Sequence, residues 1–341
     1  MSESYIGGYF GWERRQGAGL EWLTHAAKYQ SARCAIAAFV GAVNPIRIWL
    51  PNYICGDVSD ALNACGVQIS RYSLSAAWTV PQDVRLQRND WLLCVDYFGI
   101  CREQIADVLA RFGPNRVLVD AAQSLFYRAE VGESVVYSPR KFLGLPDGGM
   151  LLSHLTLPSA YNADERGSAQ RCKHLQSRAH GCVMQGYQQF RQAEKSLESC
   201  VPKAMSRLTE RHLATVDADF VSKQRIINYN FLAKSLMDRM LSVPPLPSGA
   251  VPLCCPVLNV PAASMRDALI EQGIFLPTYW PAIAIPDNDT VALGLRDETL
   301  YLPCDQRYTP AELARVVDAV SFQLEHRNSV NKAWTRSFGI L

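Results

Sequence analysis

The sequence predicts an α/β protein built on a mostly parallel sheet, and two observations support this prediction. From residue 47 onward, apolar runs typical of strands alternate with amphipathic segments typical of helices. One apolar run, residues 91–95, is continuous rather than alternating, as expected for a strand buried on both faces. Because parallel strands need crossover connections, helices should cover both faces of the sheet.

The elements of the sheet follow in order along the first half of the chain. A helix over residues 57–64 should end at Gly66, and a second helix over 105–112 should end at Gly113. The expected strands are residues 47–51, 67–72, 91–95, 116–120, 134–137 and 150–154.

The second half of the chain predicts a long helix and then a smaller α/β lobe. The long helix covers 222–240, and its apolar stripe is Ile226, Tyr229, Leu232, Leu236 and Met240. The proline-rich segment 243–249 predicts a hinge between the long helix and the second domain. A helix at 264–272, a strand at 300–303 and a helix opened by the capping box Thr309-Pro-Ala-Glu312 follow. We therefore expect a large domain over 1–240, with an N-terminal arm over 1–15, and a small C-terminal domain over 241–341.

The composition favours small-molecule chemistry. The 341 residues carry a net charge of only +2, and 19% are charged, so nothing indicates nucleic acid or an acidic membrane surface as a partner. The longest apolar stretch, 34–43, is too short to span a bilayer, and no signal peptide is visible. The 11 cysteines lack a CxxC pair, so we expect no metal site, reduced thiols and a cytoplasmic location.

Three motifs in order carry the candidate chemistry. Ser31 is suited to cap a helix start, whose amides can bind an anion. Asp120-Ala-Ala-Gln123 ends an apolar strand, where ligands of parallel sheets bind. Ser138-Pro-Arg-Lys141 follows the next strand, and Asp147-Gly-Gly149 comes shortly after it.

Together these motifs resemble the pyridoxal-phosphate (PLP) enzymes of the aspartate-aminotransferase fold, fold type I. The nearest likeness is a divergent branch of the DegT/DnrJ/EryC1/StrS family. The resemblance implies a large α/β/α domain plus a small C-terminal α/β domain, with PLP held on Lys141 as a Schiff base. It places Asp120 opposite the pyridine nitrogen and Gln123 near the phenolic oxygen. The phosphate would be bound by the hydroxyls of Ser31 and Ser138 and by the amides of Ala32 and Arg33.

Two positions depart from the family pattern. Many members have an aromatic residue at the position of Cys55, where it stacks on the pyridine ring; here Tyr53, Tyr97 or Phe98 must take that role, and Tyr53 is our cofactor-site candidate. Pro202 occupies the position of an asparagine that often reaches the partner subunit's cofactor.

The family resemblance implies an aminotransferase. Its amino donor would be glutamate or glutamine, and its acceptor a keto compound such as a nucleotide-linked keto-sugar of cell-surface polysaccharide or secondary-metabolite synthesis. A homodimer with shared sites is expected by the same analogy, with weak support from the aromatic residues Tyr9, Phe10 and Trp12. Arg296 and Arg307 are the candidates for binding the donor carboxylate.

Two alternative functions remain open. A class V type PLP enzyme such as a cysteine desulfurase shares the Asp-x-x-Gln and Ser-x-x-Lys patterns. Such enzymes usually have one histidine directly before the lysine, where this chain has Arg140, and another that stacks on the ring. No histidine lies in 50–60 or 95–100, where a stacking residue is expected. A non-catalytic PLP-fold protein that binds a sugar or a partner is the second alternative, favoured by Cys55 and Pro202.

Overall fold

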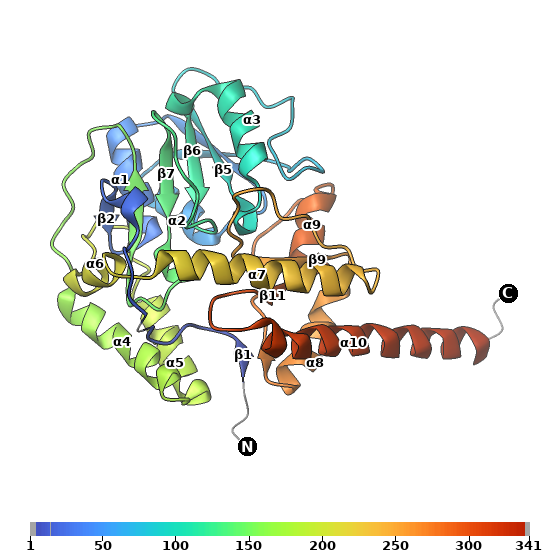
Figure 1. The fold of residues 1–341 in the computed structure, drawn as a ribbon. Helices are drawn as coiled ribbons and strands as arrows, with labels where there is room; N and C mark the ends of the chain where they lie inside the picture. Colours follow the sequence, from blue (N-terminus) through green and yellow to red (C-terminus); the bar gives the residue numbers. More distant parts are fainter. Residues whose placement is uncertain (1–4, 14, 338–341) are drawn as a thin grey trace.

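A seven-stranded, mostly parallel sheet forms the centre of the computed structural model, which describes residues 5–13 and 15–337 (Figure 1). The strand order is β2-β8-β7-β6-β5-β3-β4. Strand β8 is antiparallel to both of its neighbours, and the others run in one direction. The bounds are β2 Ala27–Tyr29, β3 Arg47–Pro51, β4 Gln68–Tyr72, β5 Asp90–Val95, β6 Val117–Ala121, β7 Ser134–Tyr137 and β8 Gly149–Leu152. The predicted α/β class is confirmed.

All six expected strands are present, within two residues of their expected bounds. Strand β2 was not predicted, because it has only three residues and only Tyr29 among them is buried. Helices α1 (Ala32–Val43), α2 (Gly56–Ala64) and α3 (Arg102–Phe112) connect the strands of this half.

Helices α4 to α7 follow the sheet in sequence. Their bounds are α4 Glu165–Ala179, α5 Val183–Lys195, α6 Arg207–Leu213 and α7 Ala218–Met237. The expected stripe of α7 is correct for Tyr229, Leu232 and Leu236, which are fully buried, but wrong for Met240, which is 95% exposed. The helix ends at Met237, so Met240 no longer lies on the helical stripe, and its backbone φ is +62°.

The C-terminal lobe has its own hydrophobic core. Its elements are β9 Cys254–Leu258, α8 Ala262–Glu271, β10 Ile274–Phe275, α9 Thr290–Asp297, β11 Thr299–Pro303 and α10 Pro310–Ser337. Strands β9 and β11 are antiparallel, whereas β10 pairs in parallel with β1 (Ile6–Gly7). Ile6 and the buried stripe of α7 both belong to this second core. The N-terminal segment and α7 thus pack within the C-terminal lobe, and the division at residue 240 stays a prediction.

The capping box at the start of α10 is confirmed by its hydrogen bonds. The Thr309 amide donates to Glu312 Oε2 at 2.8 Å, and the Glu312 amide donates to Thr309 Oγ1 at 3.4 Å. Figure 1 shows α10 lying beside α7 and then continuing away from the body of the molecule.

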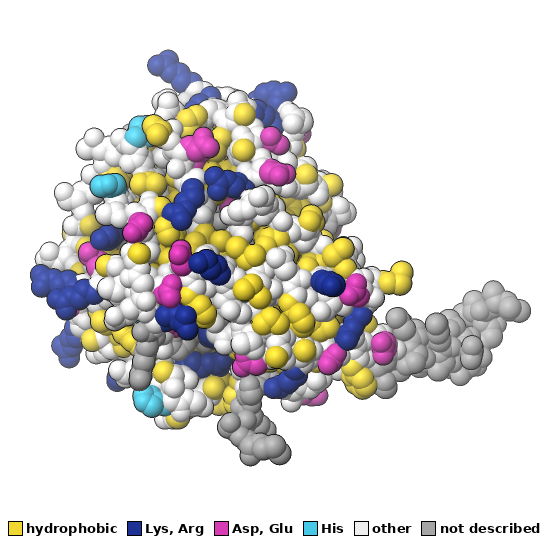
Figure 2. Space-filling model, viewed as in Figure 1, with side chains coloured by type: hydrophobic (Ala, Val, Ile, Leu, Met, Phe, Trp, Pro, Cys, Tyr) yellow, Lys and Arg dark blue, Asp and Glu magenta, His cyan; other side chains and the backbone are white. Residues whose placement is uncertain are grey.

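The surface seen in Figure 2 shows acidic and basic side chains interspersed. This agrees with the small net charge of +2. All eleven cysteines are free thiols. Within residues 5–13 and 15–337, no helix combines the length and the apolar character needed to cross a membrane.

Candidate active site

The three motifs meet at one edge of the sheet. Strands β6 and β7 are parallel neighbours, so the segments that follow them emerge side by side. Asp120 is the next-to-last residue of β6 and Gln123 follows that strand, whereas Ser138 and Lys141 follow β7. Strand β2 runs in the same direction as β7, because both are antiparallel to β8, and the N-terminus of α1 therefore lies at the same edge.

Lys141 is placed by a single tight turn, the 3₁₀ helix Pro139–Lys141. Its amide donates to the Ser138 carbonyl at 3.1 Å, and the Phe142 amide donates to Pro139 at 2.9 Å. The Lys141 ammonium lowers the pKa of Asp120 and also that of Cys55, although burial makes both pKa values higher than usual. The charge of Lys141 therefore acts on both Asp120 and Cys55.

Asp120 keeps one carboxylate oxygen available. The side chain is buried, and the Ala122 amide donates to Oδ1 at 2.9 Å. Burial raises its pKa, and the Lys141 ammonium opposes that rise. No donor among the described residues reaches Oδ2. Oδ2 is therefore free to accept a hydrogen bond from a protonated ring nitrogen of a ligand.

Gln123 has an unpartnered donor. Its Oε1 accepts the Phe98 amide at 3.0 Å, which fixes the orientation of the side-chain amide. Its Nε2 is buried and has no hydrogen-bond partner among the described residues. A buried donor without an acceptor is costly, so this nitrogen fits a ligand oxygen in the site.

The N-terminus of α1, called here the cradle, carries the amides that we expect to bind the phosphate. Ser31 Oγ accepts the Cys34 amide at 3.2 Å and the Ser31 carbonyl accepts the Ala35 amide at 3.1 Å. Helix geometry leaves the amides of Ala32 and Arg33 without intrahelical acceptors. The Arg33 guanidinium does not join them, because it pairs with Asp57 at 2.6 Å.

Glycine is required where β8 approaches this cradle. A Cβ on Gly149 would lie 2.0 Å from the carbonyl carbon of Ser31 and 2.2 Å from the nitrogen of Ala32. Ser31 and Ser138 are both buried at this edge. The glycine pair after Lys141 thus brings β8 against the start of α1.

The three aromatic candidates for ring stacking lie in one cluster. Tyr53 is fully buried, and its ring contacts Tyr97 at 5.7 Å and Trp280 at 4.8 Å between centroids. Its hydroxyl lies 2.8 Å from that of Tyr301. Phe98 also contacts the Tyr301 ring, at 4.9 Å. The cluster joins the sheet to the C-terminal lobe, and stacking by Tyr53 stays a prediction.

Both arginine candidates for the donor carboxylate already have acidic partners. Arg307 donates to Asp305 through Nε at 2.7 Å and through Nη2 at 2.9 Å. It also binds the carbonyls of Gly8 and Tyr9. Arg296 pairs with Asp297 at 2.7 Å. Arg307 therefore fastens the N-terminal segment rather than presenting a free guanidinium.

The aromatic residues of the N-terminal segment pack within their own chain. Tyr9 stacks on Phe190 at 5.3 Å, Trp12 contacts His212 at 5.4 Å, and the Arg307 guanidinium lies 4.2 Å above the Phe10 ring. These contacts account for the packing of the three residues within one chain and do not test a dimer. The dimer itself stays a prediction.

Asp147, in the motif Asp147-Gly-Gly149, is a buried hydrogen-bonding centre, a role that the sequence did not predict. Its Oδ1 accepts from Thr209 Oγ1 at 2.6 Å and from Ser206 Oγ at 3.1 Å, and its Oδ2 faces Arg171 at 3.4 Å. These contacts hold the glycine pair next to the cradle. The partners lie 24 to 62 residues away in the sequence, so no local pattern could have identified them.

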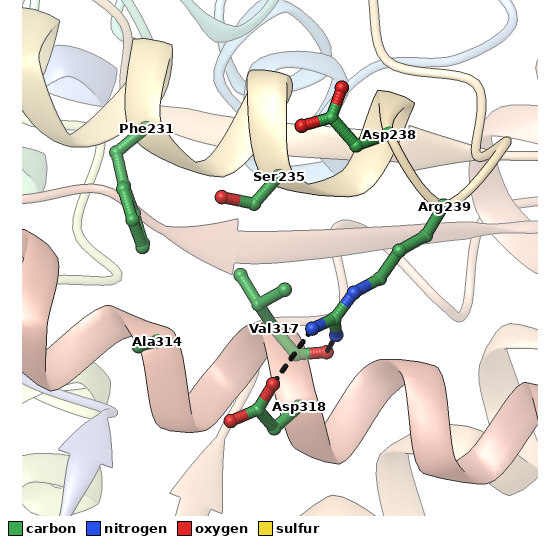
Figure 3. Close-up of a pocket in the computed structure, with 7 residues that line it drawn as sticks. All are labelled: Phe231, Ser235, Asp238, Arg239, Ala314, Val317 and Asp318. Atoms are coloured by element: carbon green, nitrogen blue, oxygen red, sulfur yellow. Dashed lines mark hydrogen bonds and ion pairs between the residues drawn. The ribbon is translucent and has the colours of Figure 1, made fainter.

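Two surface hollows lie away from this edge. The first is a groove of about 240 Å³ between α7 and α10, shown in Figure 3, where Arg239 pairs with Asp318 at 2.9 Å and binds the Val317 carbonyl. The second contains Arg85, Arg111 and Arg116. The terminal nitrogens of Arg111 donate to loop carbonyls, including Pro81 at 2.9 Å, so they stabilise the loop. Neither hollow contains a candidate site residue.

Solved aminotransferases share this architecture. TlmJ from Streptoalloteichus hindustanus is 15% identical, and the match covers 95% of this chain and all of TlmJ with a TM-score of 0.65. DesV from S. venezuelae is 17% identical over 90% of this chain and 88% of its own, at 0.62. DesI, solved in the presence of its TDP-sugar product, is 16% identical over 92% and 88%, also at 0.62. No protein-family model and no curated protein matches the sequence.

The chain therefore has the fold of the PLP-dependent transferases of type I, as the sequence predicts. At identities below 20% the likeness establishes the fold and nothing finer.

Proposed function

We propose that this protein is a PLP-dependent aminotransferase of the DegT/DnrJ/EryC1/StrS family that binds its cofactor at Lys141. The observation that carries the proposal is the buried, unpartnered Nε2 of Gln123 beside Asp120, at the sheet edge that also holds Lys141. The fold and the motif order support it.

The residues present fit the cofactor. Lys141 would hold its aldehyde carbon, Asp120 Oδ2 would accept from the pyridine nitrogen, and Gln123 Nε2 would donate to the phenolic oxygen. The amides of Ala32 and Arg33 and the Ser31 and Ser138 hydroxyls would bind the phosphate. PLP would supply an electron sink for the bonds at the donor's α-carbon.

The protein's own residues then account for proton transfer and orientation. The Lys141 amine would carry a proton as general acid and base. Asp120 would keep the pyridine nitrogen protonated, because a buried carboxylate forms a strong, charge-assisted hydrogen bond with a protonated nitrogen. The buried aromatic cluster of Tyr53, Tyr97 and Phe98 would exclude water from one side of the site.

For substrates, we propose a glutamate or glutamine donor and a nucleotide-linked keto-sugar acceptor, in polysaccharide or secondary-metabolite synthesis. DesI, which has the same fold, was solved with its TDP-sugar product. We also propose a cytoplasmic homodimer: eleven free thiols suit a reducing compartment, and the dimer rests on family analogy. A monomer in sedimentation with full activity would refute the dimer.

Borohydride trapping tests the cofactor assignment. Protein mixed with PLP should turn yellow, and reduction should attach one pyridoxyl group to Lys141. Lys141→Arg should abolish the adduct, whereas Lys173→Arg, at an exposed position on α4, should leave it unchanged. A colourless protein without an adduct would leave only the non-catalytic alternative.

The reaction class needs a second assay. Formation of 2-oxoglutarate from glutamate with a nucleotide keto-sugar would support transamination. Release of sulfide from cysteine by the yellow protein would support the desulfurase alternative and contradict our proposal.

A further inference from the structure

Side chains from three distant parts of the chain hold the backbone that follows Lys141. The Phe142 carbonyl accepts Gln306 Nε2 at 2.8 Å and Arg225 Nη2 at 3.3 Å. The Gly144 amide donates to Glu13 Oε2 at 3.2 Å. The peptide groups directly after the lysine are therefore fixed by the N-terminal segment, by α7 and by the loop after β11.

These three side chains also bind one another. Gln306 Nε2 donates to Glu13 Oε1 at 2.6 Å, and Arg225 Nε donates to Gln306 Oε1 at 2.9 Å. The glutamine amide therefore has its acceptor end on the guanidinium and its donor end on the carboxylate. Turning the Gln306 amide over would lose both hydrogen bonds, so its side chain has a single favourable orientation.

Burying the guanidinium of Arg225 carries a large desolvation cost. The residue is 0% exposed, and the carboxylates of Asp305 and Glu13 act on its charge without a direct ion pair among the described residues. Its Nη1 donates to the carbonyls of Pro252 at 3.1 Å and Leu253 at 3.0 Å, and its guanidinium lies 4.4 Å above the Phe142 ring. Burial lowers the pKa of Arg225, and the charges of Asp305 and Glu13 oppose that effect. An apolar side chain here would leave these carbonyls without this donor, so the guanidinium ties the Phe142 carbonyl to the loop at 252–253.

The N-terminal segment approaches the same turn closely. A Cβ on Gly144 would lie 1.9 Å from the Gly11 carbonyl oxygen. The segment is in turn fastened by Arg307, which binds the carbonyls of Gly8 and Tyr9. Glu13 therefore reaches the lysine turn from a backbone that is itself held in place.

We propose that Glu13, Gln306 and Arg225, called here the lysine clamp, are positioning residues that orient the Lys141 amine toward the cofactor. This inference rests on the proposed function. The clamp acts through the backbone of Phe142 and Gly144 and touches no reacting atom. Because a displacement of about 1 Å can slow a reaction by roughly 100-fold, fixing this backbone matters for proton transfer by Lys141.

Hydrogen exchange of the full chain without PLP tests the clamp without any activity assay. In Glu13→Ala, the amides of residues 141–145 should exchange at least about tenfold faster, while those of β5 and β6 keep their rates. In Glu13→Gln, which keeps one side-chain acceptor, the same amides should exchange at rates between those of the wild type and of Glu13→Ala. Glu21→Ala, at an exposed position of the same N-terminal region, is the matched control.

The PLP-loaded enzyme gives a second readout. Glu13→Ala should lower kcat by about 100-fold and change the KM for the amino donor by less than about threefold. The midpoint of the pH-dependent absorbance of the lysine-bound cofactor should also move. If Glu13→Ala does not fold, Arg225→Lys provides the same comparison, because lysine keeps the charge but loses the planar fork.

The outcomes separate the two proposals. Normal PLP loading with unchanged exchange and unchanged kcat would overturn the clamp alone. A uniform rise of exchange across β5 and β6 would also overturn it, because that result indicates a purely structural role. A wild-type chain that takes no PLP at Lys141 would overturn the proposed function, and with it the clamp's role toward the cofactor.

Discussion

At the scale of single residues, Gln123 combines a structural and a binding role in one amide. Its oxygen satisfies the Phe98 amide at 3.0 Å, and its nitrogen is left for a ligand. The resemblance to the PLP enzymes of fold type I predicts the binding role of this residue. It does not predict the bond to Phe98, because that partner lies 25 residues away on another strand end.

Replacing Gln123 by methionine should therefore have two separate effects. The Phe98 amide loses its acceptor, which should lower the free energy of unfolding by about 1–3 kcal/mol. PLP should bind about tenfold more weakly, because one charge-assisted hydrogen bond is lost. Urea unfolding and a PLP titration measure the two effects, with the exposed Gln192→Met as control. Lower stability with unchanged PLP affinity would restrict Gln123 to a structural role.

At the scale of elements, the start of α1 and the start of β8 determine each other's position. Ser31 is the N-cap that the sequence predicts, and its Oγ accepts the Cys34 amide. The glycine pair after Lys141 is equally visible in the sequence. Only the structure shows that Gly149 is needed because β8 lies against the carbonyl carbon of Ser31.

Two glycine-to-alanine changes should have opposite signs. In Gly149→Ala the new Cβ would lie 2.0 Å from the carbonyl carbon of Ser31, so the backbone must move. This change should destabilise the protein by about 3 kcal/mol and weaken phosphate binding. Gly41→Ala, inside α1, meets only a Pro158 side-chain atom at 3.5 Å and should stabilise by about 0.5–1 kcal/mol. Urea unfolding checks both; equal effects would contradict the close approach of β8 and α1.

At the scale of the whole molecule, packing places the N-terminal segment against α4 and α5 and against the C-terminal lobe. His174 on α4 is buried beside Tyr9 and Phe190, with ring centroids 5.9 and 5.5 Å away. Burial and the nearby Arg140 lower the pKa of His174 to about 4, and Glu194 opposes them. The folded protein therefore keeps this imidazole neutral at a pH where an unfolded chain would bind a proton.

His174 should make the protein sensitive to acid. Because its pKa is lower in the folded state, its stabilising effect is complete above about pH 6.5 and is lost as the pH falls toward 4. The loss should amount to about 3 kcal/mol. His174→Phe should flatten the pH dependence of thermal unfolding in that window, whereas the exposed His154→Gln should not. An unchanged profile in His174→Phe would show that other groups control acid stability.

The sequence by itself determined the sheet, its helices and the place of Lys141 and Asp120 at the strand ends. Strand and helix periods, caps and glycine stops are local, so they can be read without knowing any long-range contact. Strand β2 could not be predicted in this way, because three residues are too few to show the alternation of a strand. Tertiary structure alone decided the partners of Asp147, the partners of Arg307 and the lysine clamp. The bond between Glu13 and Gln306 spans 293 residues, and only packing of the complete chain brings such groups together.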